Sequence, residues 1–170
     1  SLAVIEECSF SACIAKNNGA GIYNDSSNPA IRGCTFTGNG AWSESSGGGA
    51  VCNNASSPQI EDCVFSGNGS RHGAGIFNGN QSSPTITGCD FVGNMTGQEG
   101  DSFGAGVYGD HSSLTISDCT FSNNTAVNGA GIYIAYSSGT ISRCVFNGNK
   151  ADRDGHGGFG GGICYNEDFS

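Results

Sequence analysis

The side chains that could do chemistry in this sequence are nine cysteines, three histidines and fifteen acidic residues. No C-x2-C pair and no His-containing cluster has the spacing of a zinc site. The segment 152–156, Asp-Arg-Asp-Gly-His, faintly resembles a calcium-binding loop but lacks the downstream glutamate ligand. His72 and His111 fall in other predicted loops or turns, where a solvated turn residue is the simpler interpretation. The sequence therefore predicts no metal and no cofactor.

Basic residues, which a polysaccharide-active enzyme would need beside its carboxylates, are sparse. Six Lys and Arg residues oppose fifteen Asp and Glu residues, for a formal charge of −9. We expect Arg32 and Arg143 at bends and Arg71 in a loop, so that none stacks with a carboxylate of a neighbouring segment. The sequence thus predicts no catalytic residues and a protein that is not an enzyme. The acidic charge also argues against a nucleic acid partner, and no apolar run approaches transmembrane length.

The elements that must position these side chains form a repeat, in which copies follow one another every 25–30 residues. Each copy has an isoleucine, a cysteine three residues later, a phenylalanine two further on and an asparagine three after that. The columns are Ile5, Ile31, Ile60, Ile86, Ile116 and Ile141; Cys8, Cys34, Cys63, Cys89, Cys119 and Cys144; Phe10, Phe36, Phe65, Phe91, Phe121 and Phe146; and Asn39, Asn68, Asn94, Asn124 and Asn149, with Cys13 in the first copy. A glycine-led segment then supplies Ile22, Val51, Ile76, Val107, Ile132 and Ile163.

The spacing within each copy predicts three short strands separated by bends. Cys and Phe lie two residues apart and so share one face of a strand, whereas Ile lies an odd number of positions from Cys. A bend between Ile and Cys brings both inside, and Gly33, Asp62, Gly88 and Asp118 occupy that position. Three strands with bends form one coil of a parallel β-helix, in which identical residues of successive coils stack. We predict one all-β domain spanning 1–170, with about six coils.

Six of the cysteines form one of these inward columns. There a cysteine acts as a small hydrophobic residue that fits a layer, and we expect the column to be buried and reduced. Disulfides between neighbouring coils are the alternative, although parallel side chains point the wrong way for one. Cys52 and Cys164 follow the inward aliphatic residue of the glycine-led segment by one position, so both are predicted to face outward.

The chain resembles the right-handed parallel β-helix repeat proteins, and in particular the polymorphic outer-membrane proteins. The resemblance rests on the F-x-x-N motif, read as FTGN, FSGN, FVGN, FSNN and FNGN, and on GGAV at 48–51; other copies read GAGI, GAGV or GGGI. It implies a right-handed coil and a secreted or surface-exposed protein used for adhesion or as an external structural element. Pectate-lyase-like enzymes share the fold, so the fold alone sets no function.

The segments that follow the asparagine column are alternately short and long. The long ones, Gly40–Gly48, Met95–Phe103 and Lys150–Phe159, leave the same corner on every second coil. They are either tolerated insertions or a row of lateral contacts to a neighbouring protein or a glycan. The candidate contact residues are Trp42, Glu44, Glu99, Asp101, Phe103, Asp152, Asp154 and Phe159.

Neither end of the chain offers a helix or a charged cover for its apolar layer, which solenoids usually need. Because the last segment ends at the phase where the first begins, we predict head-to-tail stacking of chains into a filament; a fragment cut from a longer β-helix is the alternative. The candidate end-to-end interface is Ile5, Cys13, Ile163 and Cys164. The sequence thus predicts an extracellular or cell-surface structural protein. A surface adhesin that binds glycans and a pectate-lyase-like enzyme fragment remain the alternatives.

Overall fold

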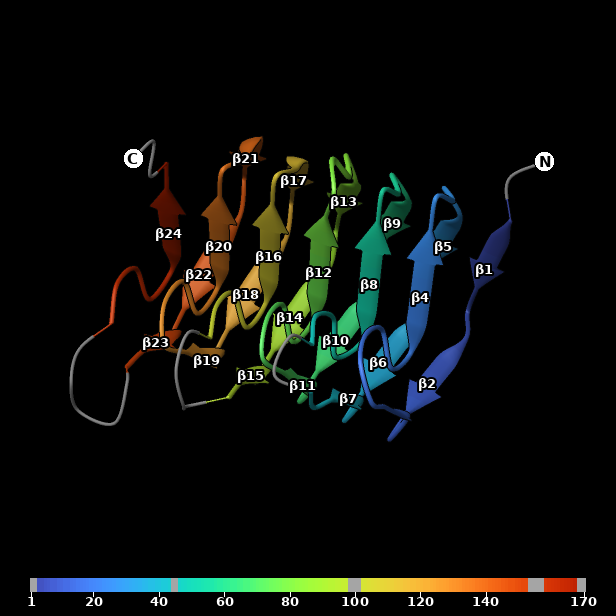
Figure 1. Ribbon diagram of the computed structural model, residues 1–170, viewed down its shortest axis with the longest axis horizontal. Helices are drawn as coiled ribbons and strands as arrows, with labels where there is room; N and C mark the ends of the chain where they lie inside the picture. The colour runs from blue at the N-terminus through green and yellow to red at the C-terminus, as the bar shows by residue number, and fades with distance from the viewer. Residues whose placement is uncertain (1–2, 44–45, 98–101, 153–157, 168–170) are drawn as a thin grey trace.

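The computed structural model describes residues 3–43, 46–97, 102–152 and 158–167. These residues form short parallel strands that wind as a solenoid, with the first and the last strand at opposite ends of the stack (Figure 1). The described chain contains no helix that is long and apolar enough to span a membrane.

Each coil contains four strands, and equivalent strands of successive coils form four six-stranded parallel sheets. The isoleucine sheet consists of β1 (Val4–Glu6), β5 (Ala30–Arg32), β9 (Gln59–Glu61), β13 (Thr85–Thr87), β17 (Ser113–Ser117) and β21 (Ser138–Ser142). The phenylalanine sheet consists of β2 (Ser9–Ser11), β6 (Thr35–Thr37), β10 (Val64–Ser66), β14 (Asp90–Val92), β18 (Thr120–Ser122) and β22 (Val145–Asn147).

The other two sheets complete each coil. The short-strand sheet consists of β3 (Ile14–Ala15), β7 (Gly40–Ala41), β11 (Gly69–Ser70), β15 (Met95–Thr96), β19 (Thr125–Ala126) and β23 (Lys150–Ala151). The glycine-led sheet consists of β4 (Ile22–Asp25), β8 (Val51–Asn54), β12 (Ile76–Gly79), β16 (Val107–Asp110), β20 (Ile132–Ala135) and β24 (Ile163–Asn166). The described chain therefore makes six coils, with five turns between β1 and β21.

The prediction of three strands per coil was wrong by one strand. The missing element is the short-strand sheet, whose members have only two residues each. Two residues cannot show the alternation of apolar and polar side chains by which a strand is recognised in a sequence. The parallel β-helix itself and its register are confirmed, because Ile31 pairs with Ile5 and Ile60, and Phe65 with Phe36 and Phe91.

The predicted bend between Ile and Cys is confirmed in every coil. The bend residues all have a positive φ, and they are Glu7, Gly33, Asp62, Gly88, Asp118 and Arg143. Arg32 was wrongly placed at this bend: it is the last residue of β5, and Gly33 with φ of 57° is the bend itself. The bend changes the direction of the chain between the two strands, so the Ile and Cys side chains both point into the coil.

Flat stacking of phenylalanine rings fills the interior. Ring centroids of successive phenylalanines lie 4.7–5.0 Å apart, with planes within 7° of parallel. Phe36, Phe65, Phe91 and Phe121 are fully buried. This distance equals the spacing of neighbouring strands. The strands therefore hold successive rings at a separation at which aromatic rings can stack.

The asparagine column forms a hydrogen-bonded ladder along one corner. The side-chain amide of Asn94 donates to Oδ1 of Asn124 at 3.0 Å and to the carbonyl of Phe65 at 2.9 Å. Its own Oδ1 accepts from the backbone and side chain of Asn68 at 3.0 and 2.9 Å. Each buried asparagine therefore satisfies its amide through the coils above and below it.

A second ladder was not anticipated from the sequence. In β4, β8 and β12 the inward residue is asparagine, and Nδ2 of Asn24 donates to Asn53, and Nδ2 of Asn53 to Asn78, each at 2.8 Å. In later coils the same register carries Gly109 and Ile134 instead. Leu114 fills the space at Gly109, where an added Cβ would lie 2.8 Å from its Cδ1. The interior of one sheet thus changes from polar to apolar along the solenoid.

Candidate functional site

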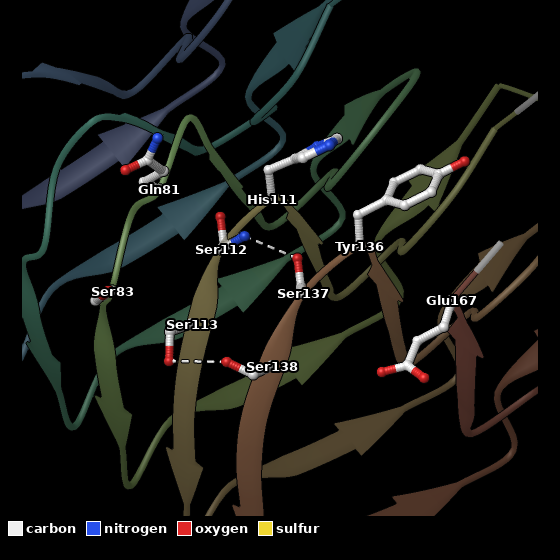
Figure 2. A pocket seen from close by; sticks show the side chains of 9 residues that line it. All are labelled: Gln81, Ser83, His111, Ser112, Ser113, Tyr136, Ser137, Ser138 and Glu167. Atoms are coloured by element: carbon white, nitrogen blue, oxygen red, sulfur yellow. Dashed lines mark hydrogen bonds between the residues drawn. The ribbon is translucent and has the colours of Figure 1, made fainter. Parts of the chain in front are cut away.

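A hollow lies on the corner between the glycine-led and isoleucine sheets, over the later coils (Figure 2). Its volume is about 650 Å³. The side chains that line it are mostly hydroxyl-bearing: Gln81, Ser83, His111, Ser112, Ser113, Tyr136, Ser137, Ser138 and Glu167. These residues come from the turns that follow β12, β16, β20 and β24 and from the starts of the next strands. We call this hollow the corner pocket.

Two stacked rings form a wall of the corner pocket. The centroids of the His111 and Tyr136 rings lie 4.9 Å apart, with planes 24° from parallel. Both residues have a positive φ, and this backbone conformation turns the chain at the corner. Gln81, in the coil before His111, also has a positive φ. The backbone N–H of His111 donates to the carbonyl of Ala135 at 3.1 Å. The hydrogen bonding between adjacent coils of the sheet therefore continues into the corner. The rings are therefore held one coil apart, and Tyr136 remains 48% exposed.

Two rows of serines form another side of the pocket. In the inner row, the N–H of Ser112 donates to Oγ of Ser137 at 2.8 Å, and both residues are buried. In the outer row, Oγ of Ser138 lies 3.3 Å from Oγ of Ser113 and both are exposed (Figure 2). The inner hydroxyls therefore hold the corner together, whereas the outer ones are available to a ligand.

One carboxylate stands at the far side of the pocket. Oε1 of Glu167 lies 2.6 Å from the Tyr165 hydroxyl, which also lies 2.9 Å from the carbonyl of Ser137. The bond to Glu167 raises the pKa of Tyr165 above its ordinary value. Tyr165 thus links the carboxylate to the serine corner.

His111 and the neighbouring serines do not form a nucleophilic triad. Nδ1 of His111 lies 2.8 Å from Oδ1 of Asp110, an adjacent and partly exposed residue. The imidazole lies over Tyr136 rather than toward the serine rows (Figure 2). Within the described ranges no hydroxyl is hydrogen-bonded to this imidazole. The arrangement suits binding better than acyl transfer, which needs a base in contact with its nucleophile.

Among the candidate contact residues predicted on the long loops, the four that the structure describes do not converge on one site. Trp42 is 61% exposed and lies across Gly40 and Gly69 of the short-strand sheet. Phe103 stacks on Tyr133 with centroids 4.5 Å apart, so it packs on the glycine-led sheet instead of protruding. Asp152 forms an ion pair with Lys150 at 2.7 Å. Phe159 is 76% exposed. Glu44, Glu99, Asp101 and Asp154 lie outside the described residues.

Phe103 is not a protruding loop residue because the long segments return to a ladder shared with the short ones. Parallel bridges join Gly47 to His72, His72 to Phe103, and Phe103 to Asn128. At this ladder, His72 also stacks on Phe103, with centroids 5.5 Å apart. Side chains of the ladder therefore pack against the outer aromatic residues of the glycine-led sheet, which the sequence pattern alone did not indicate.

The predicted end-to-end residues lie in the first and last coils. Ile5 packs against the core but is only partly buried, and Ile163 is exposed. The N–H of Cys13 donates to Oδ1 of Asn39 at 3.0 Å, as expected for the asparagine column. Cys164 pairs in register with Tyr133 on the outer face of the glycine-led sheet. Cys13 and Cys164 are both free thiols.

The cysteine column follows the prediction of burial in the interior coils but not in the first and last coils. The interior members of the column are buried free thiols: Cys34, Cys63, Cys89 and Cys119. Cys8 is exposed and Cys144 is only partly buried, because they belong to the first and last coils. Cys52 does face away from the coil interior, in register with Tyr23 and Phe77. It is nevertheless buried, which raises the pKa of its thiol to about 12.

The expectation that no arginine stacks with a carboxylate was wrong. Nε of Arg32 lies 2.9 Å from Glu61, and Nη1 lies 3.4 Å from Glu6. Arg143 binds both carboxylate oxygens of Asp118 at 2.6 and 2.7 Å. Strand register places these residues directly opposite one another in adjacent coils. The pairs are exposed and lie apart from the corner pocket.

No group of three or more metal-ligating side chains occurs among the residues that the structure describes. Most of the weak calcium-loop match, residues 153–156, falls outside them.

The corner pocket was missed because its residues belong to no repeating column of one residue type. Successive coils carry Ser26, Ala55, the pair Asn80 and Gln81, His111 and Tyr136 at this corner. The usable signal was the change from small to large side chains at this turn, but His111 was interpreted there as a solvated turn residue.

Comparison with known proteins identifies the fold family. No curated protein and no solved structure matches the sequence. The family described as the right handed beta helix region matches over residues 1–170. The match spans the same repeat that builds the four sheets, and the chain therefore belongs to the right-handed β-helix family.

Proposed function

We propose that this protein is an extracellular or cell-surface β-helix that binds a saccharide at the corner pocket and is not an enzyme. The observation that carries the proposal is the stacked pair of His111 and Tyr136 beside the exposed outer serine row. An aromatic ring offers a flat apolar face, and the serine hydroxyls and the Gln81 amide offer donors and acceptors. A ligand that is apolar on one face and rich in hydroxyls at its edge matches both.

The scaffold supports this use of the pocket. Each coil presents the same corner at the strand spacing of about 4.8 Å, so the pocket residues of consecutive coils form a row. The ladders of buried asparagines and stacked phenylalanines fix the coils beneath it. A rigid surface loses little conformational entropy on binding, which favours affinity.

The test is titration calorimetry of neutral oligosaccharides against the wild type and Tyr136→Ala. We expect the variant to lose at least ten-fold in affinity because it removes the ring face. Tyr23→Ala is the matched control, since Tyr23 is 49% exposed on a distant coil, and it should bind as the wild type does. Equal loss in both variants, or no binding by the wild type, would contradict the proposal.

A second candidate function is end-to-end association into filaments, and one contact favours it. Inside the solenoid the ladder residue Phe103 stacks on Tyr133 of the next coil. Phe159, the equivalent ladder residue two coils later, is 76% exposed, and Tyr23 of the first coil is also exposed. A second copy stacked on the last coil would place its Tyr23 over Phe159 as Tyr133 lies over Phe103.

Sedimentation velocity of the wild type and Ile163→Asp tests this association. The wild type should form concentration-dependent chains, and the charged last coil should abolish them. Val92→Asp places the same charge on the outer face of an interior coil and should leave assembly intact. A wild type that stays monomeric at millimolar concentration refutes filament formation and leaves saccharide binding unaffected.

A further inference from the structure

Among the described residues, the Asp, Glu, Lys and Arg side chains at the corner pocket are all acidic. Of the residues that line the pocket, Glu167 bears a carboxylate. Asp110 is not a lining residue, but its carboxylate lies beside the lining residue His111. None of the lysines and arginines that the structure describes is among the lining residues. The chain as a whole has a formal charge of −9. An anionic ligand would therefore bring its charge into this pocket without a Lys or Arg partner.

Glu167 lies on the coil that follows Tyr136, on the side of the ring that His111 does not cover. Ala135 pairs with Asn166 in the glycine-led sheet, and the N–H of Tyr136 donates to the carbonyl of Asn166 at 3.0 Å. Glu167 thus follows Tyr136 along the corner by one coil. His111 stacks on Tyr136 from the preceding coil, so the other face of the ring is directed toward the coil that carries Glu167 (Figure 2).

An aromatic face beside a carboxylate is a favourable environment for a cation. The ring attracts a cation to its face, and the carboxylate attracts it by charge. The bond from the Tyr165 hydroxyl to Oε1 restrains Glu167 without neutralising it. A carboxylate has further acceptor positions beyond this one bond, so it can also accept from an ammonium group.

We propose that the ligand of the corner pocket is a saccharide bearing a free amine, such as an oligomer of glucosamine. Its ammonium group lies between the open face of Tyr136 and Glu167, and its hydroxyls contact the outer serine row, Ser113 and Ser138. This assignment rests on the proposed saccharide binding and adds the chemical class of the ligand.

The experiment compares three oligosaccharides of equal length by titration calorimetry at low salt: one of glucosamine, one of N-acetylglucosamine and one of galacturonate. We expect the glucosamine oligomer to bind about five-fold or more tightly than the acetylated one, and the galacturonate oligomer to bind most weakly. The preference should shrink with added salt, because the carboxylate is exposed. Glu167→Gln should remove the preference while retaining binding of the acetylated oligomer.

A control separates the pocket from the general negative charge of the protein. Glu7→Gln removes one exposed carboxylate in the first coil, far from the pocket, and should retain the full preference for the amine. If glucosamine and N-acetylglucosamine oligomers bind equally and both depend on Tyr136, saccharide binding stands and the amine assignment is wrong. If Glu7→Gln weakens the preference as much as Glu167→Gln, the assignment is also wrong. If no oligomer binds, the proposed function itself fails.

Discussion

The interior columns and the corner pocket are built on the same coils. The residue types of the interior repeat from coil to coil, whereas those of the corner change. Inside, each coil repeats Ile, Cys, Phe and Asn, and the phenylalanine rings stack within 5.0 Å of one another. At the corner, the equivalent residues change from Ser26 and Ala55 to His111 and Tyr136. A buried column must match the layer above and below it, whereas a corner residue only has to continue the turn.

This difference teaches where function can be added to a repeat. A residue such as Phe91 is contacted by identical residues on both sides, so any change leaves a void or a clash in two neighbouring layers. The backbone hydrogen bonds of the corner are made whatever side chain is present. The corner can therefore acquire aromatic and charged side chains at little cost to folding.

The largest expected effect comes from removing an interior ring. Phe91→Ala should lower the free energy of unfolding by about 3–5 kcal/mol, because the ring is fully buried between two others. Phe146→Ala, in the partly exposed last coil, should cost clearly less. Urea unfolding of both variants measures this, and equal losses would show that the ends are packed as tightly as the middle.

The asparagine ladder should come next. Asn94→Ala removes a side chain with four hydrogen bonds, and it leaves the backbone N–H and one side-chain N–H of Asn68 without their acceptor. We expect a loss of about 2–3 kcal/mol from buried polar groups left unpaired. Thermal unfolding measures this loss of stability. If Asn94→Ala destabilises the protein less than an exposed control such as Asn80→Ala, the ladder does not stabilise the fold.

High pH should destabilise the fold through buried thiols. Burial raises the pKa of Cys52 from 9.0 to about 12, so between these values the unfolded chain releases a proton that the folded chain retains. Stability is thus unaffected below pH 9 and falls by about 1.4 kcal/mol per pH unit as pH rises toward 12. In urea unfolding at pH 8.5 and 10.5, Cys52→Ala should show a shallower decline than the wild type. Identical slopes would place the alkaline sensitivity elsewhere.

The cysteine column should contribute less than the rings. Cys89→Ala should cost about 1–2 kcal/mol through lost packing. In the folded protein, a thiol reagent should modify exposed Cys8 much faster than buried Cys89. Mass spectrometry of labelled peptides follows both sites, and equal labelling rates at all nine cysteines would sink the assignment of the column to the core.

The smallest effect should come from the corner pocket. Tyr136→Ala should change the free energy of unfolding by no more than about 0.5 kcal/mol, since half of the residue is exposed. Chemical unfolding beside Phe91→Ala gives the sharpest form of the comparison. A loss of several kcal/mol at Tyr136 would mean that the corner is part of the folding core.

The sequence by itself determined the coil, its interior and its bends. Four columns of identical residues at a nearly constant separation leave only a parallel stack in which Ile31, Cys34 and Phe36 all point inward. The position of the bend followed from the odd spacing of Ile and Cys. These features could be predicted because burial imposes the same residue type on every coil.

Only the tertiary structure decided the short-strand sheet, the packing of Phe103 and the corner pocket. Two-residue strands have no period to read, and Phe103 lies on a segment whose return to a shared ladder depends on contacts with other coils. Likewise Arg143 and Asp118 meet because the coil register places them side by side, 25 residues apart in sequence. The corner pocket gathers Gln81, His111, Tyr136 and Glu167 from four different coils. Their proximity arises from the stacking of coils at the strand spacing, which a pattern of single residues within each copy does not record.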